Sequence, residues 1–145
     1  MGKVIVIANQ KGGVGKTTTS VNLSACLGAA GKKVLVIDID PQGNTTSGLG
    51  VEKDDAELTV YEVMINGENL ADAIVKTDYK NLSLCPSNVN LAGAEIEMVD
   101  MENREHQLEH AIAKIRDKYD FIIVDCPPSL GLLTLNAFVA ADSVL

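Results

Sequence analysis

The chain has 145 residues, of which 46% are hydrophobic and only 3% aromatic, and its formal net charge at pH 7 is −8. This length suits one domain with an aliphatic core, and the negative charge argues against a surface that coats nucleic acid. No apolar run approaches the roughly 20 residues that span a bilayer. Cys26, Cys85 and Cys126 are widely spaced without a C-x-x-C pair, which favours reduced thiols over disulfides or a zinc site. We therefore expect a soluble cytosolic protein.

Apolar runs at residues 4–8, 34–37 and 121–124 predict three strands. Because these runs do not alternate with polar residues, they are typical of strands buried on both faces of a parallel sheet. Residues 17–30 predict the first helix, and Gly31 ends it. Residues 82–85 alternate and predict a further short strand.

Two further helices are predicted in the second half of the chain, at residues 104–118 and 132–141. In the first of these, apolar residues fall at helical spacing on one face, namely Leu108, Ala111, Ile112, Ile115 and Tyr119. His106 and His110 lie one turn apart, on or beside its charged face, where solvated side chains are favoured over a metal site. Strands that alternate with helices predict a doubly wound, mostly parallel α/β fold with ligands at the carboxyl ends of the strands.

The sequence KGGVGKT occupies residues 11–17, directly after the first predicted strand. Glycines let the backbone turn tightly and aim its N–H groups at anionic oxygens, and the following helix adds its dipole. Lys16 can then reach the β- and γ-phosphates of a nucleotide, and the hydroxyl of Thr17 can ligate magnesium. The general P-loop pattern asks for glycine where this chain has Gln10. A surface turn is the ordinary alternative, but the order of strand, loop, lysine, hydroxyl and helix predicts a phosphate-binding loop.

Acidic residues follow the second and third predicted strands. Asp38 and Asp40 begin a turn-forming segment, and in isolation they would be read as ordinary turn residues. Beside a phosphate loop, such carboxylates can hold a magnesium-bound water or orient the water that attacks the γ-phosphate. Asp125 ends a buried strand, where an acid needs a partner such as magnesium. Cys126 is expected to be a small buried thiol, and the acidic clusters at residues 52–57 and 95–105 a solvated surface.

The KGGVGKT loop resembles the deviant P-loop of the ParA/MinD group of ATPases. The resemblance implies a P-loop NTPase-like fold that binds ATP and Mg²⁺. It implies that Lys11 contacts phosphates bound by a partner subunit and that Asp40 positions the hydrolytic water, so that Lys11, Lys16 and Asp40 form the catalytic set. The implied ATP-binding residues are Lys11, Gly12, Gly13, Val14, Gly15, Lys16, Thr17 and Thr18, and the implied metal residues are Thr17, Asp38 and Asp125.

The sequences DPQGN at residues 40–44 and DCPPS at residues 125–129 look like the partitioning branch of this group. The resemblance implies a slow, ATP-dependent homodimer switch in chromosome or plasmid partitioning, with non-specific DNA binding by the ATP dimer and a ParB-type activator. It also implies a cytoplasmic, nucleoid-associated protein without a membrane partner. Family members are typically longer, so residues 1–145 are interpreted as the N-terminal part of one ATPase domain. We expect residues 144–145 to open a strand that is cut before it can pair, leaving an exposed edge and an uncovered apolar face.

Three alternatives remain open. A MinD-like switch on a membrane surface would need a C-terminal amphipathic helix. An electron-transfer protein of the nitrogenase iron-protein type would need cluster cysteines facing a dimer axis. A non-catalytic module would bind nucleotide, or block a full-length partner by mixed dimerisation, without turnover.

Overall fold

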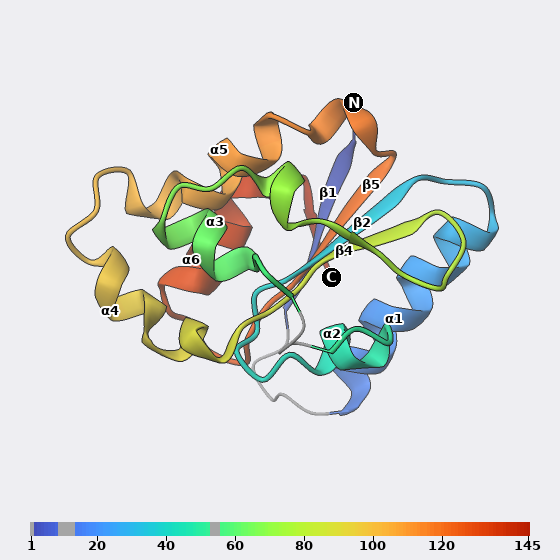
Figure 1. The fold of residues 1–145 in the computed structure, drawn as a ribbon, viewed down its shortest axis with the longest axis horizontal. Coiled ribbons are helices and arrows are strands. Elements are labelled where there is room, and N and C mark those ends of the chain that lie inside the picture. Colours follow the sequence, from blue (N-terminus) through green and yellow to red (C-terminus); the bar gives the residue numbers. More distant parts are fainter. Residues whose placement is uncertain (1, 9–13, 53–55) are drawn as a thin grey trace.

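The computed structural model describes residues 2–8, 14–52 and 56–145 of the chain, with the side chains of residues 14–17 left out. The described residues form a six-stranded sheet in the order β3-β4-β2-β5-β1-β6 (Figure 1). All neighbouring strands are parallel except β3, which pairs antiparallel with β4. The strands are β1 (Lys3–Ile7), β2 (Val34–Asp38), β3 (Val75–Lys76), β4 (Leu82–Cys85), β5 (Phe121–Asp125) and β6 (Ser143–Val144).

Helices connect these strands and cover both faces of the sheet (Figure 1). The α-helices are α1 (Val14–Ala29), α2 (Asn44–Gly48), α3 (Val60–Ile65), α4 (Ala94–Met98), α5 (Gln107–Ala113) and α6 (Leu132–Ala140). Short 3₁₀ helices are η2 (Leu70–Ala73), η3 (Val89–Gly93), η4 (Arg104–His106) and η5 (Arg116–Lys118). Among these described helices, none combines the length and the apolar character needed to cross a membrane.

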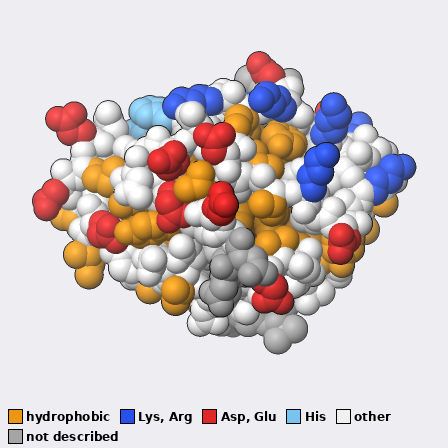
Figure 2. Space-filling model, in the orientation of Figure 1, with side chains coloured by type: hydrophobic (Ala, Val, Ile, Leu, Met, Phe, Trp, Pro, Cys, Tyr) orange, Lys and Arg blue, Asp and Glu red, His pale blue; other side chains and the backbone are white. Residues whose placement is uncertain are grey.

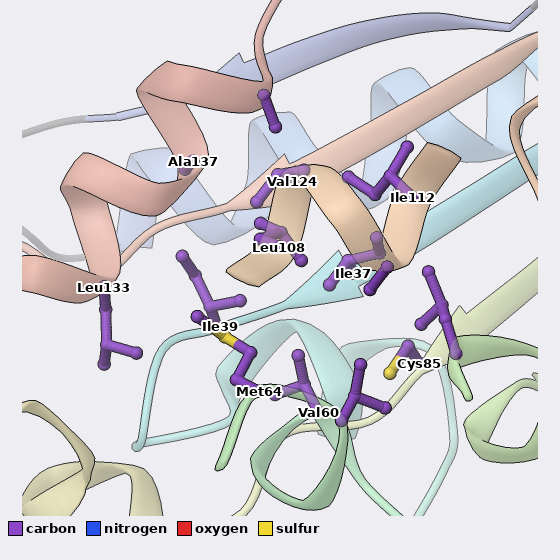
Figure 3. Packing of buried hydrophobic residues seen from close by; sticks show 14 of the residues in the cluster. Ile37, Ile39, Val60, Met64, Cys85, Leu108, Ile112, Val124, Leu133 and Ala137 are labelled. Atoms are coloured by element: carbon purple, nitrogen blue, oxygen red, sulfur yellow. The ribbon is translucent and has the colours of Figure 1, made fainter. Parts of the chain in front are cut away.

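Two apolar clusters fill the layers on either side of the sheet. On one side, α3, α4, α5 and α6 pack against strand residues that include Ile37 and Val124. Figure 3 shows these two side chains lying among residues of α3, α5 and α6. On the other side, α1 packs over Val36, Leu84 and Ile123. Burial on both faces explains why the strand sequences are continuously apolar.

The predicted strands and the helix that became α6 are confirmed within one residue, whereas α1 begins at Val14, three residues before its predicted start at residue 17. Gly31, directly after the turn that ends α1, has a φ of 92°, a left-handed conformation that favours glycine. The single helix predicted over residues 104–118 is wrong in its continuity, because η4, α5 and η5 replace it. The carbonyl of Arg116 accepts a hydrogen bond from Gly2 N at 3.1 Å, and Arg116 Nε donates to Gly2 O at 2.6 Å. These bonds connect η5 to the residue that precedes β1.

The expected absence of pairing at residues 144–145 is also wrong. β6 pairs parallel with β1 through Ser143 and Val144, and Leu145 N donates to Val6 O at 2.7 Å. Asp142 starts this pairing, because its Oδ2 accepts a hydrogen bond from Val4 N at 2.8 Å. Val144 and Leu145 nevertheless remain 55% and 63% exposed, so the edge strand carries apolar surface, as expected.

The charged side chains are unevenly distributed. Figure 2 shows Lys and Arg side chains gathered toward the end of the molecule where the strands begin, whereas Asp and Glu dominate the part that contains α4. The carboxyl ends of β2, β4 and β5 meet at the opposite edge, beside α2 (Figure 1). The candidate site lies at this second edge.

Candidate functional site

Asp38 and Asp125 occupy paired positions at the ends of the neighbouring strands β2 and β5. Both carboxylates are buried, with 0% and 1% of their residues exposed. Burial, followed by the charge of Asp125, raises the pKa of Asp38 to about 7. The sequence therefore places an excess of negative charge in the interior, at the edge of the sheet where ligands bind in such folds.

Helix α2 supplies hydrogen-bond donors to both acids. Thr45 Oγ1 donates to Asp125 Oδ2 at 2.6 Å. Thr46 donates to Asp38 Oδ2 twice, from N at 2.9 Å and from Oγ1 at 2.7 Å. The chain enters α2 through Gly43, whose left-handed φ of 65° makes the required turn. Sequence reasoning stopped at Asn44 and missed both threonines, although two hydroxyls directly after a Gly-Asn turn were a usable signal.

Asp40 lies two residues beyond the end of β2 and is only 6% exposed. Its N–H donates to Asp38 Oδ1 at 3.1 Å, and its own Oδ1 accepts from Gln42 N at 3.1 Å. Its carbonyl accepts from Gly43 N at 2.9 Å and also from the hydroxyl of Ser87. Asp40 is therefore held at its backbone by β2, by its own turn and by the segment that follows β4. Ser87 is a second residue that the sequence reasoning missed.

The phosphate-loop residues are placed only in part. Lys11, Gly12 and Gly13 lie outside the described residues. Val14, Gly15, Lys16 and Thr17 form the start of α1, without described side chains, and Thr18 is exposed. The predicted order of strand followed by helix is confirmed, since β1 ends at Ile7 and α1 begins at Val14.

The chain leaves β1 directly beside Asp125. Ile7 is paired with Asp125 across β1 and β5, and Ile7 O accepts from Cys126 N at 3.1 Å. Helix α1, which follows the loop, packs against α2. The described elements on either side of residues 9–13, β1 and α1, thus lie next to β5 and α2, which carry Asp125 and its hydrogen-bond donor Thr45.

The segment after β5 is anchored by a residue from α4. Glu95 Oε1 accepts from Leu133 N at 3.1 Å, in the first turn of α6. A Cβ atom at Gly131 would lie 2.1 Å from this carboxylate, so a larger residue there would displace the Glu95 side chain from its present position. Within the acidic cluster at residues 95–105, which was expected to be solvated, Glu95 is thus a half-buried exception. Cys126 is fully buried, as predicted.

The donor atoms fit a magnesium ion better than a softer metal. Carboxylate and hydroxyl oxygens are its preferred protein ligands, and a cation beside Asp125 would offset the charge that raises the pKa of Asp38. In the part of the chain that the structure describes, no group of three or more His, Cys, Asp or Glu side chains is placed to hold a metal. Magnesium sites of phosphate-binding proteins need few protein ligands, because waters and phosphates complete the shell.

The two histidines take no part in this site. Their rings stack with centroids 6.1 Å apart, and His106 Nδ1 lies 2.9 Å from Glu109 Oε1. His106 is half-buried and His110 exposed. The predicted preference for solvated helix residues over a metal pair agrees with this placement.

Comparisons with known proteins agree with the fold. The AAA domain family matches residues 2–145. The chain is 57% identical over 145 residues to the sporulation initiation inhibitor protein Soj of Bacillus subtilis, covering 100% of this chain and 57% of that protein. It is 50% identical over 145 residues to the chromosome partitioning protein ParA of Myxococcus xanthus, covering 100% of this chain and 51% of that protein.

A solved structure that is similar to this chain carries an ATP analogue. It is described as cobyrinic acid a,c-diamide synthase from Mycobacterium smegmatis with bound ATP analogue and magnesium, and it superposes with a TM-score of 0.95 at 44% identity. The match covers 99% of this chain and 59% of that one. The chain therefore spans a little over half the length of the relatives it matches. From the match over residues 2–145 and the P-loop order of its elements, the chain belongs to the AAA domain family of ParA/MinD type.

Proposed function

We propose that this chain belongs to an ATP-dependent dimer switch of the ParA/Soj type that acts in chromosome or plasmid partitioning. One observation carries the proposal: the acids Asp38 and Asp125 lie paired and buried beside the loop that leaves β1. Identity of 57% to Soj supports the partitioning branch over the MinD-like alternative. The ATP analogue and magnesium bound by the solved relative support ATP and Mg²⁺ as cofactors.

Each predicted site residue has a proposed role. Residues 11–18, from Lys11 to Thr18, would hold the phosphates of ATP, with Lys16 at the β- and γ-phosphates and Lys11 reaching those of a second subunit. Magnesium would lie against Thr17 and Asp125, where it neutralises charge on the phosphates. Asp38 adjoins that position through Asp125, and its described hydrogen bonds hold the backbone of Asp40 and Thr46. Asp40 would orient the attacking water.

The remaining parts of the proposal concern partners. The ATP-bound homodimer would bind DNA non-specifically in the cytoplasm, on the nucleoid, and a ParB-type protein would stimulate slow hydrolysis. An iron–sulfur function is disfavoured, because Cys85 and Cys126 are fully buried within the chain. A non-catalytic nucleotide-binding module remains the second candidate, since the chain spans only part of its relatives.

ATP turnover in the Asp40→Ala variant tests the proposal. The variant should bind MgATP as tightly as the unmodified chain, because the phosphate loop is untouched, and should lose hydrolysis. Asp117→Ala is the matched control, since Asp117 is an exposed aspartate beside the amino-terminal end of β5. Turnover in Asp40→Ala equal to that of the control would contradict the role of Asp40. Binding without any turnover in the unmodified chain would favour the non-catalytic module.

A further inference from the structure

We infer that Thr46 is a positioning residue for the hydrolytic site, which holds Asp40 in place through a closed ring of hydrogen bonds. The inference rests on the proposed function, in which Asp40 orients the attacking water. Thr46 does not touch the reacting atoms in this account. It acts on them through the backbone of Asp40.

The hydroxyl of Thr46 joins two segments that are far apart in the sequence. It donates to Asp38 Oδ2 at 2.7 Å and accepts a hydrogen bond from Ser87 N at 3.0 Å. Asp38 ends β2, whereas Ser87 follows β4, the neighbouring strand. One hydroxyl group in α2 therefore connects the carboxyl ends of two adjacent strands.

The ring is completed on the side of Asp40. Ser87 Oγ donates to the carbonyl of Asp40, and Asp40 N donates to Asp38 Oδ1 at 3.1 Å. The path from Asp38 through Thr46, Ser87 and Asp40 thus returns to Asp38. Asp38, Thr46 and Ser87 are each 0% exposed and Asp40 is 6% exposed, so water competes little for these bonds.

The side chain of Thr46 makes two of the bonds in the ring, as does that of Asp38. Removing its hydroxyl would take one donor from the buried carboxylate of Asp38 and the acceptor from Ser87 N, and unmet buried polar groups are costly. Ser87 contributes one of its two bonds through its backbone, which a substitution leaves in place. Without the hydroxyl, Thr46 keeps only its backbone bond to Asp38 Oδ2 and loses its link to Ser87, so the turn that carries Asp40 is held less firmly.

Loosening this turn should affect the chemical step more than nucleotide binding. A water held in line for attack is sensitive to its position, and a displacement of about 1 Å can cost about 100-fold in rate. The phosphates would be held by residues 11–18, which are not in the ring. A selective loss of turnover at unchanged ATP affinity is therefore the signature of this positioning role.

The test compares Thr46→Val, which is nearly isosteric but lacks the hydroxyl, with Thr46→Ser, which keeps it. Thr77→Val is the matched control, because the Thr77 hydroxyl bonds Leu82 O at 2.8 Å at the opposite end of β4. Thr46→Val should lose about tenfold or more in turnover at saturating MgATP. Its ATP affinity should stay within about twofold, and Thr46→Ser should restore turnover.

Amide hydrogen exchange supplies a readout that does not depend on hydrolysis. In nucleotide-free protein, Thr46→Val should speed exchange within residues 39–48 and at Ser87, with the rest of the sheet unchanged. Unchanged exchange there, or an ATP affinity that falls as far as turnover, would overturn the inference. If Thr46→Val does not fold, Ser87→Ala is the alternative test, because it removes the bond from Ser87 Oγ to Asp40 O. This variant should lower turnover by a smaller factor, and unchanged turnover would contradict the inference. Failure of the unmodified chain to bind ATP would instead overturn the proposed function. The exchange comparison uses nucleotide-free protein, so it would still show whether the Thr46 hydroxyl holds the segment that carries Asp40.

Discussion

Thr45 Oγ1 donates a hydrogen bond of 2.6 Å to Asp125 Oδ2, and so joins α2 to the end of β5. Its neighbour Thr46 makes the corresponding contact to Asp38 at the end of β2. Two consecutive threonines thus contact the two acids that end the central strands β2 and β5. The segment from Asp40 to α2 is therefore hydrogen-bonded to the ends of both β2 and β5, the strands that carry the acids of the proposed metal site.

Removing the Thr45 hydroxyl should destabilise the fold. Thr45→Val deletes a bond to a buried carboxylate, and we expect the free energy of unfolding to fall by about 1–3 kcal/mol. Urea unfolding in EDTA measures this change. Thr45→Ser should recover most of it, because the shorter side chain retains the donor. A Thr45→Val variant as stable as the unmodified chain would show that the bond adds nothing to stability.

The pKa of Asp38 predicts a dependence of stability on pH in the absence of magnesium. In the folded chain the pKa of Asp38 is raised to about 7, chiefly by burial and then by the charge of Asp125, whereas the pKa of a free aspartate side chain is 3.8. The folded state therefore binds more protons between these values, and this contribution to the free energy of unfolding is lost as the pH rises through about 7. Urea unfolding over this pH range should show the decline.

Asp38→Asn supplies the comparison, because it removes the titrating group while other ionisable residues remain. The variant should show a flatter dependence on pH than the unmodified chain. Parallel pH profiles for the two proteins would contradict the assigned pKa of Asp38.

The contact between Glu95 and Gly131 predicts a non-additive pair of substitutions. Glu95→Ala removes the acceptor of Leu133 N at the start of α6, and should cost about 1 kcal/mol. Gly131→Ala would place its Cβ 2.1 Å from the Glu95 carboxylate, so Glu95 must move and the same bond is lost. The double variant should therefore be more stable than the sum of the two single changes predicts, because both single changes lose the same bond. Urea unfolding of all four proteins measures the coupling, and strict additivity would contradict it.

Much of the fold was predictable because its signals are local. The strands β2 and β5 are buried on both faces, so their sequences are continuously apolar and end visibly at Asp38 and Asp125. Helix α1 follows β1 in the predicted order. Acids that end such strands were correctly expected to meet at one edge of the sheet.

The missed features depend on contacts between distant segments. Nothing near Ser87 in the sequence shows that β4 lies beside β2, and only this neighbourhood brings Ser87 to Asp40 and Thr46. In the 3₁₀ helix η5, which replaces the end of the helix predicted over residues 104–118, Arg116 bonds to Gly2, more than 100 residues away. The pairing of β6 with β1 likewise depends on Asp142 reaching Val4. Local patterns record burial and turns, but not which segments become neighbours.

Magnesium-dependent binding of a fluorescent ATP analogue, compared between the unmodified chain and Lys16→Ala, tests the central claim most directly. The account predicts saturable binding that requires Mg²⁺ and is lost in Lys16→Ala, because this lysine is expected to contact the β- and γ-phosphates. Circular dichroism of both proteins would establish that they are folded. Absence of binding by the folded, unmodified chain, or equal affinity in the Lys16→Ala variant, would contradict the assignment of residues 11–18 as a phosphate-binding loop.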